Sequence, residues 1–149
     1  MTTIRKANIT DLDQLSELFD LYRMFYNKAS DLTAGKEFLK ERIINSESEI
    51  FISIIDSKAV GFVQLYPYFS STRMKKMWLL NDLFVHSEFR GKGISKELIE
   101  VSKKLCIETK ACAVNLETSK MNDIGNSLYP STGFVLDLEN NYYSWTKEN

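Results

Sequence analysis

The chain contains 149 residues, of which 44% are hydrophobic and 26% are charged. A folded chain of this length buries roughly two-thirds of the surface that it exposes when unfolded, so a single core is sufficient. The formal net charge of -1 excludes the basic surface that sequence-independent nucleic-acid binding requires. We therefore expect one globular domain, residues 1–149, with no nucleic-acid partner.

Signals for membranes, secretion and metal binding are not found in the sequence. No apolar run reaches the length of a membrane span, and the N-terminal residues lack the apolar segment of a signal peptide. These features predict a cytoplasmic protein without a membrane partner. Cys106 and Cys112 have no second Cys or His at metal-ligand spacing, and His86 is the one histidine. We interpret the cysteines as reduced core thiols and expect no metal.

The N-terminal third predicts a strand followed by two helices. Residues 3–9 are typical of a strand, and Thr10 with Asp13 three residues later is typical of a helix N-cap. Apolar residues at helical spacing follow at Leu12, Leu15, Leu18, Phe19, Tyr22, Phe25 and Tyr26. A shorter helix is expected from Thr33 to Ile44.

The centre of the chain predicts three antiparallel strands. Residues 49–55 and 59–69 flank a turn-forming segment and form a hairpin, and residues 74–85 form the next strand. Strict alternation in this third strand places Trp78, Leu80, Asp82 and Phe84 on one face.

The remaining elements complete an α+β fold. Apolar residues at Ile94, Leu98, Val101 and Leu105 predict a helix, residues 112–118 a buried strand, and residues 122–134 another short helix. Two closing strands are expected at residues 134–138 and 142–146. The sum is a mixed sheet of six or seven strands, with helices on both faces and one parallel crossover.

The segment RGKGIS, residues 90–95, has the character of an anion-binding loop. Gly91 and Gly93 lie between a strand end and a helix start, where free backbone N–H groups and the helix dipole favour a phosphate. Arg90 and Lys92 add positive charge. The alternative is an ordinary solvated turn. The spacing fits neither a P-loop nor a dinucleotide fingerprint.

These residues resemble the cofactor motif of the GNAT acetyltransferase family, Arg/Gln-x-x-Gly-x-Gly/Ala, with Arg90, Gly93 and Ser95 at its marked positions. Ser95 replaces the usual Gly or Ala. The family's downstream pattern, Asn-x-x-Ala-x-x-Leu-Tyr and then Gly-Phe, is matched by Asn122, Gly125, Leu128, Tyr129, Gly133 and Phe134. The segment LNDLFV is similar to the diamine acetyltransferase branch, which has a carboxylate where this chain has Asn81.

The resemblance implies the GNAT fold, with a V-shaped split between strands 4 and 5 that binds acetyl-CoA. The cofactor would contact the strand backbone at Leu83, Phe84 and Val85. It would also contact the loop and the start of the following helix at Arg90, Gly91, Lys92, Gly93, Ile94 and Ser95, and would contact Asn122 further along the chain. Many relatives pair through their closing strands, so the resemblance leaves a homodimer open.

For catalysis, the resemblance assigns Tyr129 as the acid that protonates the departing thiolate. Asp82 is our first candidate for the base, either directly or through water, and Glu117 is the second. A purely structural carboxylate at Asp82 is the alternative. The oxyanion would be met by a strand amide near Leu83.

Aromatic residues predict the acceptor side of the site. Tyr26, Tyr66 and Tyr68, together with Asn81 and Glu117, are candidates for binding a cationic amine. Tyr22 fits either this cage or the core. The predicted function is acetylation of a primary amine on a small molecule or peptide. The alternatives are a noncatalytic acyl-CoA-binding regulatory module and a nucleotide phosphotransferase, which the loop spacing disfavours.

Overall fold

The computed structural model describes residues 1–149, which divide into two compact units, Met1–Glu117 and Thr118–Asn149. The larger unit holds a five-stranded sheet in the order β1-β2-β3-β4-β5. Its strands are β1 (Thr3–Lys6), β2 (Glu49–Ile55), β3 (Lys58–Ser70), β4 (Lys75–Val85) and β5 (Val114–Asn115). β1 to β4 pair with one another in antiparallel fashion, and β5 is parallel to β4. The predicted α+β class is confirmed, with fewer strands than expected.

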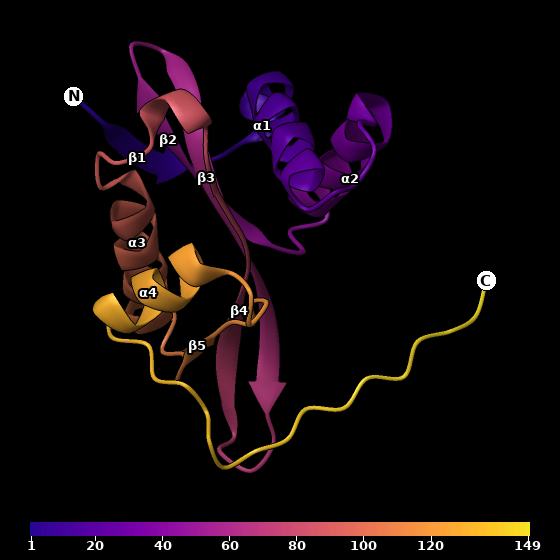
Figure 1. Cartoon of the computed structure of the whole chain (residues 1–149), viewed down its shortest axis with the longest axis vertical. Helices are drawn as coiled ribbons and strands as arrows, with labels where there is room; N and C mark the ends of the chain where they lie inside the picture. Colours follow the sequence, from indigo (N-terminus) through magenta and orange to yellow (C-terminus); the bar gives the residue numbers. More distant parts are fainter. The chain divides into compact units, whose positions relative to one another are not determined.

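Three helices of the larger unit cover both faces of this sheet. α1 (Leu12–Phe25) and α2 (Leu32–Ile44) lie on one face, and α3 (Ile94–Glu108) lies on the other (Figure 1). The core under α1 and α2 consists mainly of Leu12, Leu15, Leu18, Phe19, Leu39, Ile50, Ile52, Phe62 and Phe84. The smaller unit contains α4 (Asp123–Ser131). None of the helices has the length and apolar character needed to cross a membrane.

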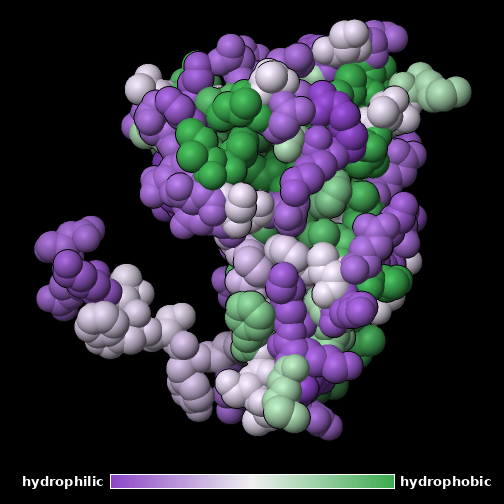
Figure 2. Space-filling view, turned by 180° about the vertical axis from the view of Figure 1, so that it is seen from behind, coloured by the Kyte–Doolittle hydropathy of each residue, from purple (hydrophilic) through white to green (hydrophobic).

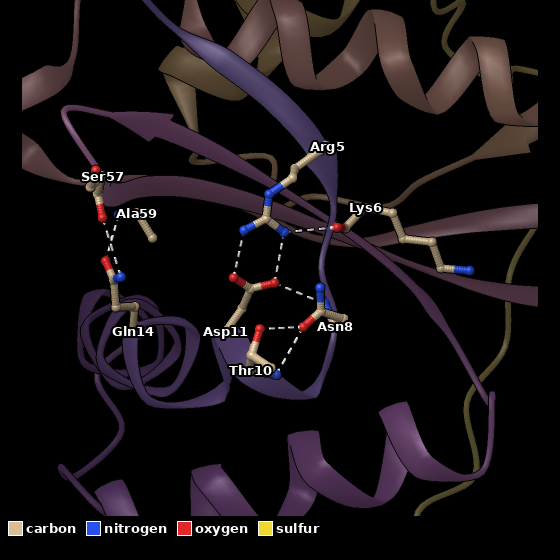
Figure 3. A network of polar contacts seen from close by, with 8 residues as sticks. All are labelled: Arg5, Lys6, Asn8, Thr10, Asp11, Gln14, Ser57 and Ala59. Atoms are coloured by element: carbon tan, nitrogen blue, oxygen red, sulfur yellow. Dashed lines mark hydrogen bonds and ion pairs between the residues drawn. The ribbon is translucent and has the colours of Figure 1, made fainter.

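The connection from β1 to α1 is fixed by a polar network around Asn8 and Asp11 (Figure 3). Asn8 Oδ1 accepts from the Thr10 N–H at 2.9 Å, and Asp11 Oδ2 accepts from the Asn8 N–H at 2.8 Å. Arg5 donates to both Asp11 oxygens, at 2.8 and 2.7 Å. The predicted cap at Thr10 and Asp13 is therefore wrong, because a 3-10 turn precedes α1 and moves the capping residues closer to β1.

A β-bulge in β4 changes which residues share a face. Gln64 of β3 pairs with Asp82, whereas the next residue, Leu65, pairs with Leu80, so Asn81 has no opposite partner. Trp78, before the bulge, donates to Oγ1 of Thr109, the residue that follows α3, at 2.9 Å. The predicted common face is wrong, because the extra residue reverses the alternation.

Beyond the bulge, Phe84 packs against Tyr22 of α1, with ring centroids 6.1 Å apart. The bulge therefore moves Asp82 and Phe84 from the α3 face, where Trp78 lies, to the α1 face.

The two predicted closing strands do not form. Residues 134–149 contain no helix or strand, and the large apolar side chains after Phe134 are exposed, including Val135 at 92% and Trp145 at 87%. Within this segment the Asp137 carboxylate accepts from the N–H groups of Glu139 and Asn140 at 2.9 and 3.0 Å. Such local side-chain bonds stabilise a turn in competition with strand pairing.

Candidate active site

The edge of β4 that faces β5 is open over half of its length. β5 pairs with β4 only through Val114 with Trp78 and Asn115 with Leu79, although the sequence predicts a strand over 112–118. β4 continues to Val85 with no strand on this side. The split predicted between strands 4 and 5 is thereby confirmed.

The backbone of β4 presents specific groups to this open edge. The His86 N–H donates to Val60 O of β3 at 2.8 Å. Backbone groups of successive strand residues point in opposite directions, so His86 and Phe84 face β3, whereas Leu83 and Val85 face the open edge. Of the three predicted backbone contacts, Leu83 and Val85 thus have suitable geometry, whereas the backbone of Phe84 faces β3 and its side chain packs under α1.

The loop after β4 leads directly into the N-terminus of α3. Gly91 and Gly93 have φ angles of 77° and 83°, in the left-handed region that favours glycine. A β-carbon added at either position would meet nothing within 4 Å, so the space beside the loop is open. No side chain caps α3, which begins at Ile94. The first N–H groups of the helix, including those of Ile94 and Ser95, are therefore available for an anion.

The two cationic residues of the loop are held by aromatic rings. Arg90 Nε donates to Val85 O at 2.9 Å, and its guanidinium lies 5.4 Å from the Phe84 ring centroid. Lys92 Nζ lies 5.1 Å from the centroid of Phe89. Arg90 therefore ties the loop to the end of β4, in addition to adding positive charge there.

Asp82 is a buried carboxylate at the bulge, only 5% exposed. Gln64 Nε2 donates to its Oδ2 at 2.8 Å and Asn81 Nδ2 to its Oδ1 at 3.1 Å. Burial raises the pKa of Asp82, and hydrogen bonds from Gln64, Tyr22 and Asn81 oppose this rise. The Asp82 carboxylate therefore has hydrogen-bond donors for both of its oxygens, and its raised pKa means that it takes up a proton more readily than a surface aspartate.

Ser48 extends this polar network from the loop before β2. Its hydroxyl donates to Gln64 Oε1 at 2.8 Å, which orients the Gln64 amide so that the nitrogen faces Asp82. Sequence reasoning did not identify Gln64 or Ser48. A signal was present, because Gln64 is the only polar side chain in the buried run from Ala59 to Leu65.

A cavity of about 280 Å³ opens above Asp82 on the α1 and α2 face of the sheet. Its aromatic walls are Phe19, Tyr22, Tyr26, Phe38 and Tyr66, and its polar residues are Arg23, Lys28, Asn81 and Asp82. Figure 2 shows hydrophobic side chains gathered on the surface where α1 and α2 lie, and Phe25 and Phe38 are among the exposed residues of these helices. The cavity thus has a carboxylate, Asp82, at its floor and aromatic side chains in its wall.

The cavity brings together three of the five residues predicted for the acceptor side, along with the candidate base Asp82, and excludes the other two. Tyr26, Tyr66, Asn81 and Asp82 all line it. Burial, followed by the nearby Asp82 charge, raises the pKa of Tyr66 to about 12, so this phenol stays protonated at neutral pH. By contrast, Tyr68 accepts a hydrogen bond from Asn115 and does not line the cavity.

Glu117, the other excluded residue, is exposed beyond the end of β5. Tyr22 belongs both to the core and to the acceptor side, because it packs on Phe62 and also lines the cavity.

The smaller unit holds Tyr129 in a well-defined helix end. The Phe134 N–H donates to Tyr129 O at 3.1 Å and the Gly133 N–H to Pro130 O at 3.1 Å. Gly133 has a φ of 95°, and the rings of Tyr129 and Phe134 are 5.9 Å apart. This is a Schellman motif with its hydrophobic contact, so the Tyr129-to-Phe134 pattern has a structural basis of its own.

Asn122 caps the start of the same helix. Its Oδ1 accepts from the Gly125 N–H at 3.0 Å and its Nδ2 donates to Thr118 Oγ1 at 2.9 Å. A β-carbon at Gly125 would lie 2.5 Å from Asn122 Nδ2, so the glycine leaves room for the cap. Asn122 thus has a capping role that is independent of any cofactor.

Comparison with known proteins identifies the family. Residues 15–134 match the acetyltransferase (GNAT) family. This chain belongs to the GNAT family. An uncharacterized N-acetyltransferase of Bacillus subtilis, YhfO, is 40% identical to it over 134 residues, 90% of each chain. The crystal structure of a probable acetyltransferase is 34% identical to this GNAT protein and superposes with a TM-score of 0.94, covering 99% of both chains.

Other relatives indicate the chemistry of the family. An aminoglycoside N(6')-acetyltransferase type 1 of Salmonella typhimurium is 25% identical to this GNAT protein over 134 residues, 88% of this chain and 90% of that one. GNAT enzymes use acetyl-CoA as their co-substrate. The protein is accordingly an N-acetyltransferase, and its resemblance to the GNAT family is confirmed.

Proposed function

We propose that this GNAT enzyme transfers the acetyl group of acetyl-CoA to a primary amine of a small molecule or peptide by direct attack. One observation carries the proposal. β4 offers an open backbone edge at Leu83 and Val85 immediately beside the buried Asp82 at the base of an aromatic cavity. Donor and acceptor sites can therefore meet at one strand.

The donor site would be formed by the end of β4 and the start of α3. The backbone groups of Leu83 and the N–H of Val85 have the direction needed to bind an extended amide chain as an added strand would, whereas Val85 O already accepts from Arg90 Nε. Gly91 and Gly93 leave space for a pyrophosphate beside the free N–H groups of α3. When bound, acetyl-CoA supplies an activated thioester. The N–H of Leu83 is the proposed donor to its carbonyl oxygen.

Asp82 is the proposed group that prepares the amine for attack. An ammonium ion must lose a proton before it is nucleophilic, and the Asp82 carboxylate is the acidic residue that lines the cavity. Burial raises its pKa, which makes it a better base than an exposed aspartate. Asn81, by contrast, cannot accept a proton usefully. Its amide donates to Asp82 and holds the carboxylate in place.

Tyr129 is the proposed acid for the departing thiolate, an assignment that rests on the family pattern from Asn122 to Phe134. The Schellman motif supports this role, because it fixes the backbone that carries the phenol.

The function is tested by assaying free thiol release from acetyl-CoA with a panel of primary amines. Amine-dependent thiol release and an acetylated product are expected. Acetyl-CoA should also raise the melting temperature, because a ligand that binds only the folded state stabilises it. Stabilisation by ATP alone would refute the proposal. Acetyl-CoA binding without turnover on any amine would identify a noncatalytic binding module instead.

A further inference from the structure

The cavity above Asp82 also has a cationic side, which a simple amine would not use. Arg23 and Lys28, from the end of α1 and the loop after it, line the same cavity as Asp82. A polyamine with its first ammonium at Asp82 would direct its remaining positive charge toward these cations. Like charges placed opposite each other at a binding site disfavour the ligand. The charge distribution of the cavity therefore selects against a second ammonium group.

Arg23 and Lys28 have no carboxylate partner within the protein. Neither forms an ion pair within 4 Å; Arg23 Nη1 donates to Ala29 O at 3.1 Å. The charge of Arg23 does act on one carboxylate, because it contributes to lowering the pKa of Asp20. The Asp20 oxygens, however, already accept from Ser30 Oγ and the Asp31 N–H.

Arg42 provides the contrast. It stacks 4.4 Å from the centroid of the cavity residue Phe38, yet it is paired with two acids, Glu41 at 3.0 Å and Glu47 at 3.2 Å. Its charge is therefore compensated within the fold. Among the cations around this cavity, Arg23 and Lys28 are the ones that a ligand could pair with.

The cavity is small. At about 280 Å³ it lies at or below the lower end of the range for drug-sized ligands, roughly 300 to 1,000 Å³. It therefore suits a compact ligand, or the end of a larger one, with both charges close together.

We infer that the acceptor is a compact zwitterionic amine of the amino-acid class, whose ammonium group binds at Asp82 among the aromatic rings and whose carboxylate binds Arg23 and Lys28. The inference rests on the proposed function, because it names the substrate class for the same site. Guanidinium and ammonium groups both form charge-assisted hydrogen bonds to a carboxylate, and removal of the carboxylate leaves them without that partner.

The test compares matched acceptors that differ only in this group. Amino acids with a primary amine are assayed with acetyl-CoA beside their carboxamides and their decarboxylated amines, and kcat/KM is measured for each. The carboxylate form should be preferred at least tenfold over the carboxamide. In Arg23→Gln and in Lys28→Gln this preference should fall at least fivefold, and further in the double variant. Lys40→Gln removes the same charge from α2 outside the cavity and should keep the preference.

Direct binding separates the two possible failures. The same amine pairs are titrated into the protein in the presence of coenzyme A by calorimetry. Tighter binding of the carboxylate form, lost in Arg23→Gln, supports the inference even if no acceptor is turned over, in which case the proposed function fails alone. Turnover of amines with equal or better use of the carboxamide or decarboxylated form, unchanged by Arg23→Gln and Lys28→Gln, overturns the inference while the proposed function stands.

Discussion

Replacement of Asp82 by Asn removes the charge at the base of the cavity and keeps its shape. The new amide would present a nitrogen toward either Gln64 Nε2 or Asn81 Nδ2, both of which are donors. Gln64 can adapt by rotating its amide, because the Ser48 hydroxyl can accept as well as donate a hydrogen bond. We therefore expect Asp82→Asn to fold.

The expected stability change is small because two effects oppose each other. Burial raises the pKa of Asp82 above 3.8, so the folded state binds more protons than the unfolded state between that value and the raised one. Stability is consequently lost as the pH rises through this window, and Asn abolishes the loss. Against this, charge-assisted hydrogen bonds are replaced by neutral ones, each worth about 1 kcal/mol less. We expect a net change within about 1 kcal/mol, or about 4 °C in melting temperature.

The expected loss of activity is much larger. General base catalysis contributes typically about 10²- to 10⁴-fold, so kcat/KM for the amine should fall by at least about 100-fold in Asp82→Asn. Thiol release measures this rate, and calorimetry with acetyl-CoA should give a dissociation constant within about twofold of the parent. In the parent, kcat/KM should decline as the pH falls through the raised pKa of Asp82, because the carboxylate becomes protonated.

Two variants control for structural effects. Ser48→Ala disturbs the same hydrogen-bond network without removing the Asp82 charge, and Glu117→Gln removes the exposed carboxylate beyond β5. Both should retain most of the activity. A folded Asp82→Asn protein with kcat/KM within about twofold of the parent would exclude Asp82 from catalysis, and a large loss in Glu117→Gln would transfer the role to that residue.

Three further predictions concern other parts of the protein. Tyr129→Phe keeps the ring contact with Phe134 and should lower turnover about 100-fold or more with little change in acetyl-CoA affinity by calorimetry; unchanged turnover would remove Tyr129 from the mechanism. Gly93→Ala forces an alanine into φ of 83° and should cost about 1–2 kcal/mol in urea unfolding and weaken acetyl-CoA binding; unaltered binding would argue against a phosphate site there. Asp11→Asn should cost about 0.5–2 kcal/mol at neutral pH. Arg5 lowers the pKa of Asp11, so this difference should vanish as the pH falls below 3.8, and its persistence in acid unfolding curves would contradict the ion-pair explanation.

Much of the fold and the loop could be predicted from the sequence because they depend on local patterns. The helical spacing of apolar residues predicted α3. The two glycines between a strand and that helix predicted a loop, and both have positive φ angles. The short helix before Gly133 was also predictable, because glycine at that position ends a helix in the left-handed conformation.

The bulge at Asn81 could not be predicted, because it depends on how β3 and β4 align. A strand read by itself has a period of two, and only its pairing with β3 reveals an extra residue. The cationic side of the cavity was missed for the same reason. Arg23 and Lys28 are unremarkable in the sequence, and only the packing of α1 over β4 brings them to the cavity of Asp82. The prediction of the two closing strands was wrong for a related reason, because the strand propensity of a segment does not show whether it pairs with another strand.

The most direct test of the proposed donor site is an NMR titration of the amide-labelled protein with acetyl-CoA. Saturable shifts should concentrate at the N–H groups of Leu83, Val85, Gly93 and Ser95, because these face the open edge of β4 or the start of α3. The amide signals of β1, at the far edge of the sheet, should not shift. Saturable binding that leaves residues 83–95 unshifted would contradict the proposal that acetyl-CoA lies along this edge.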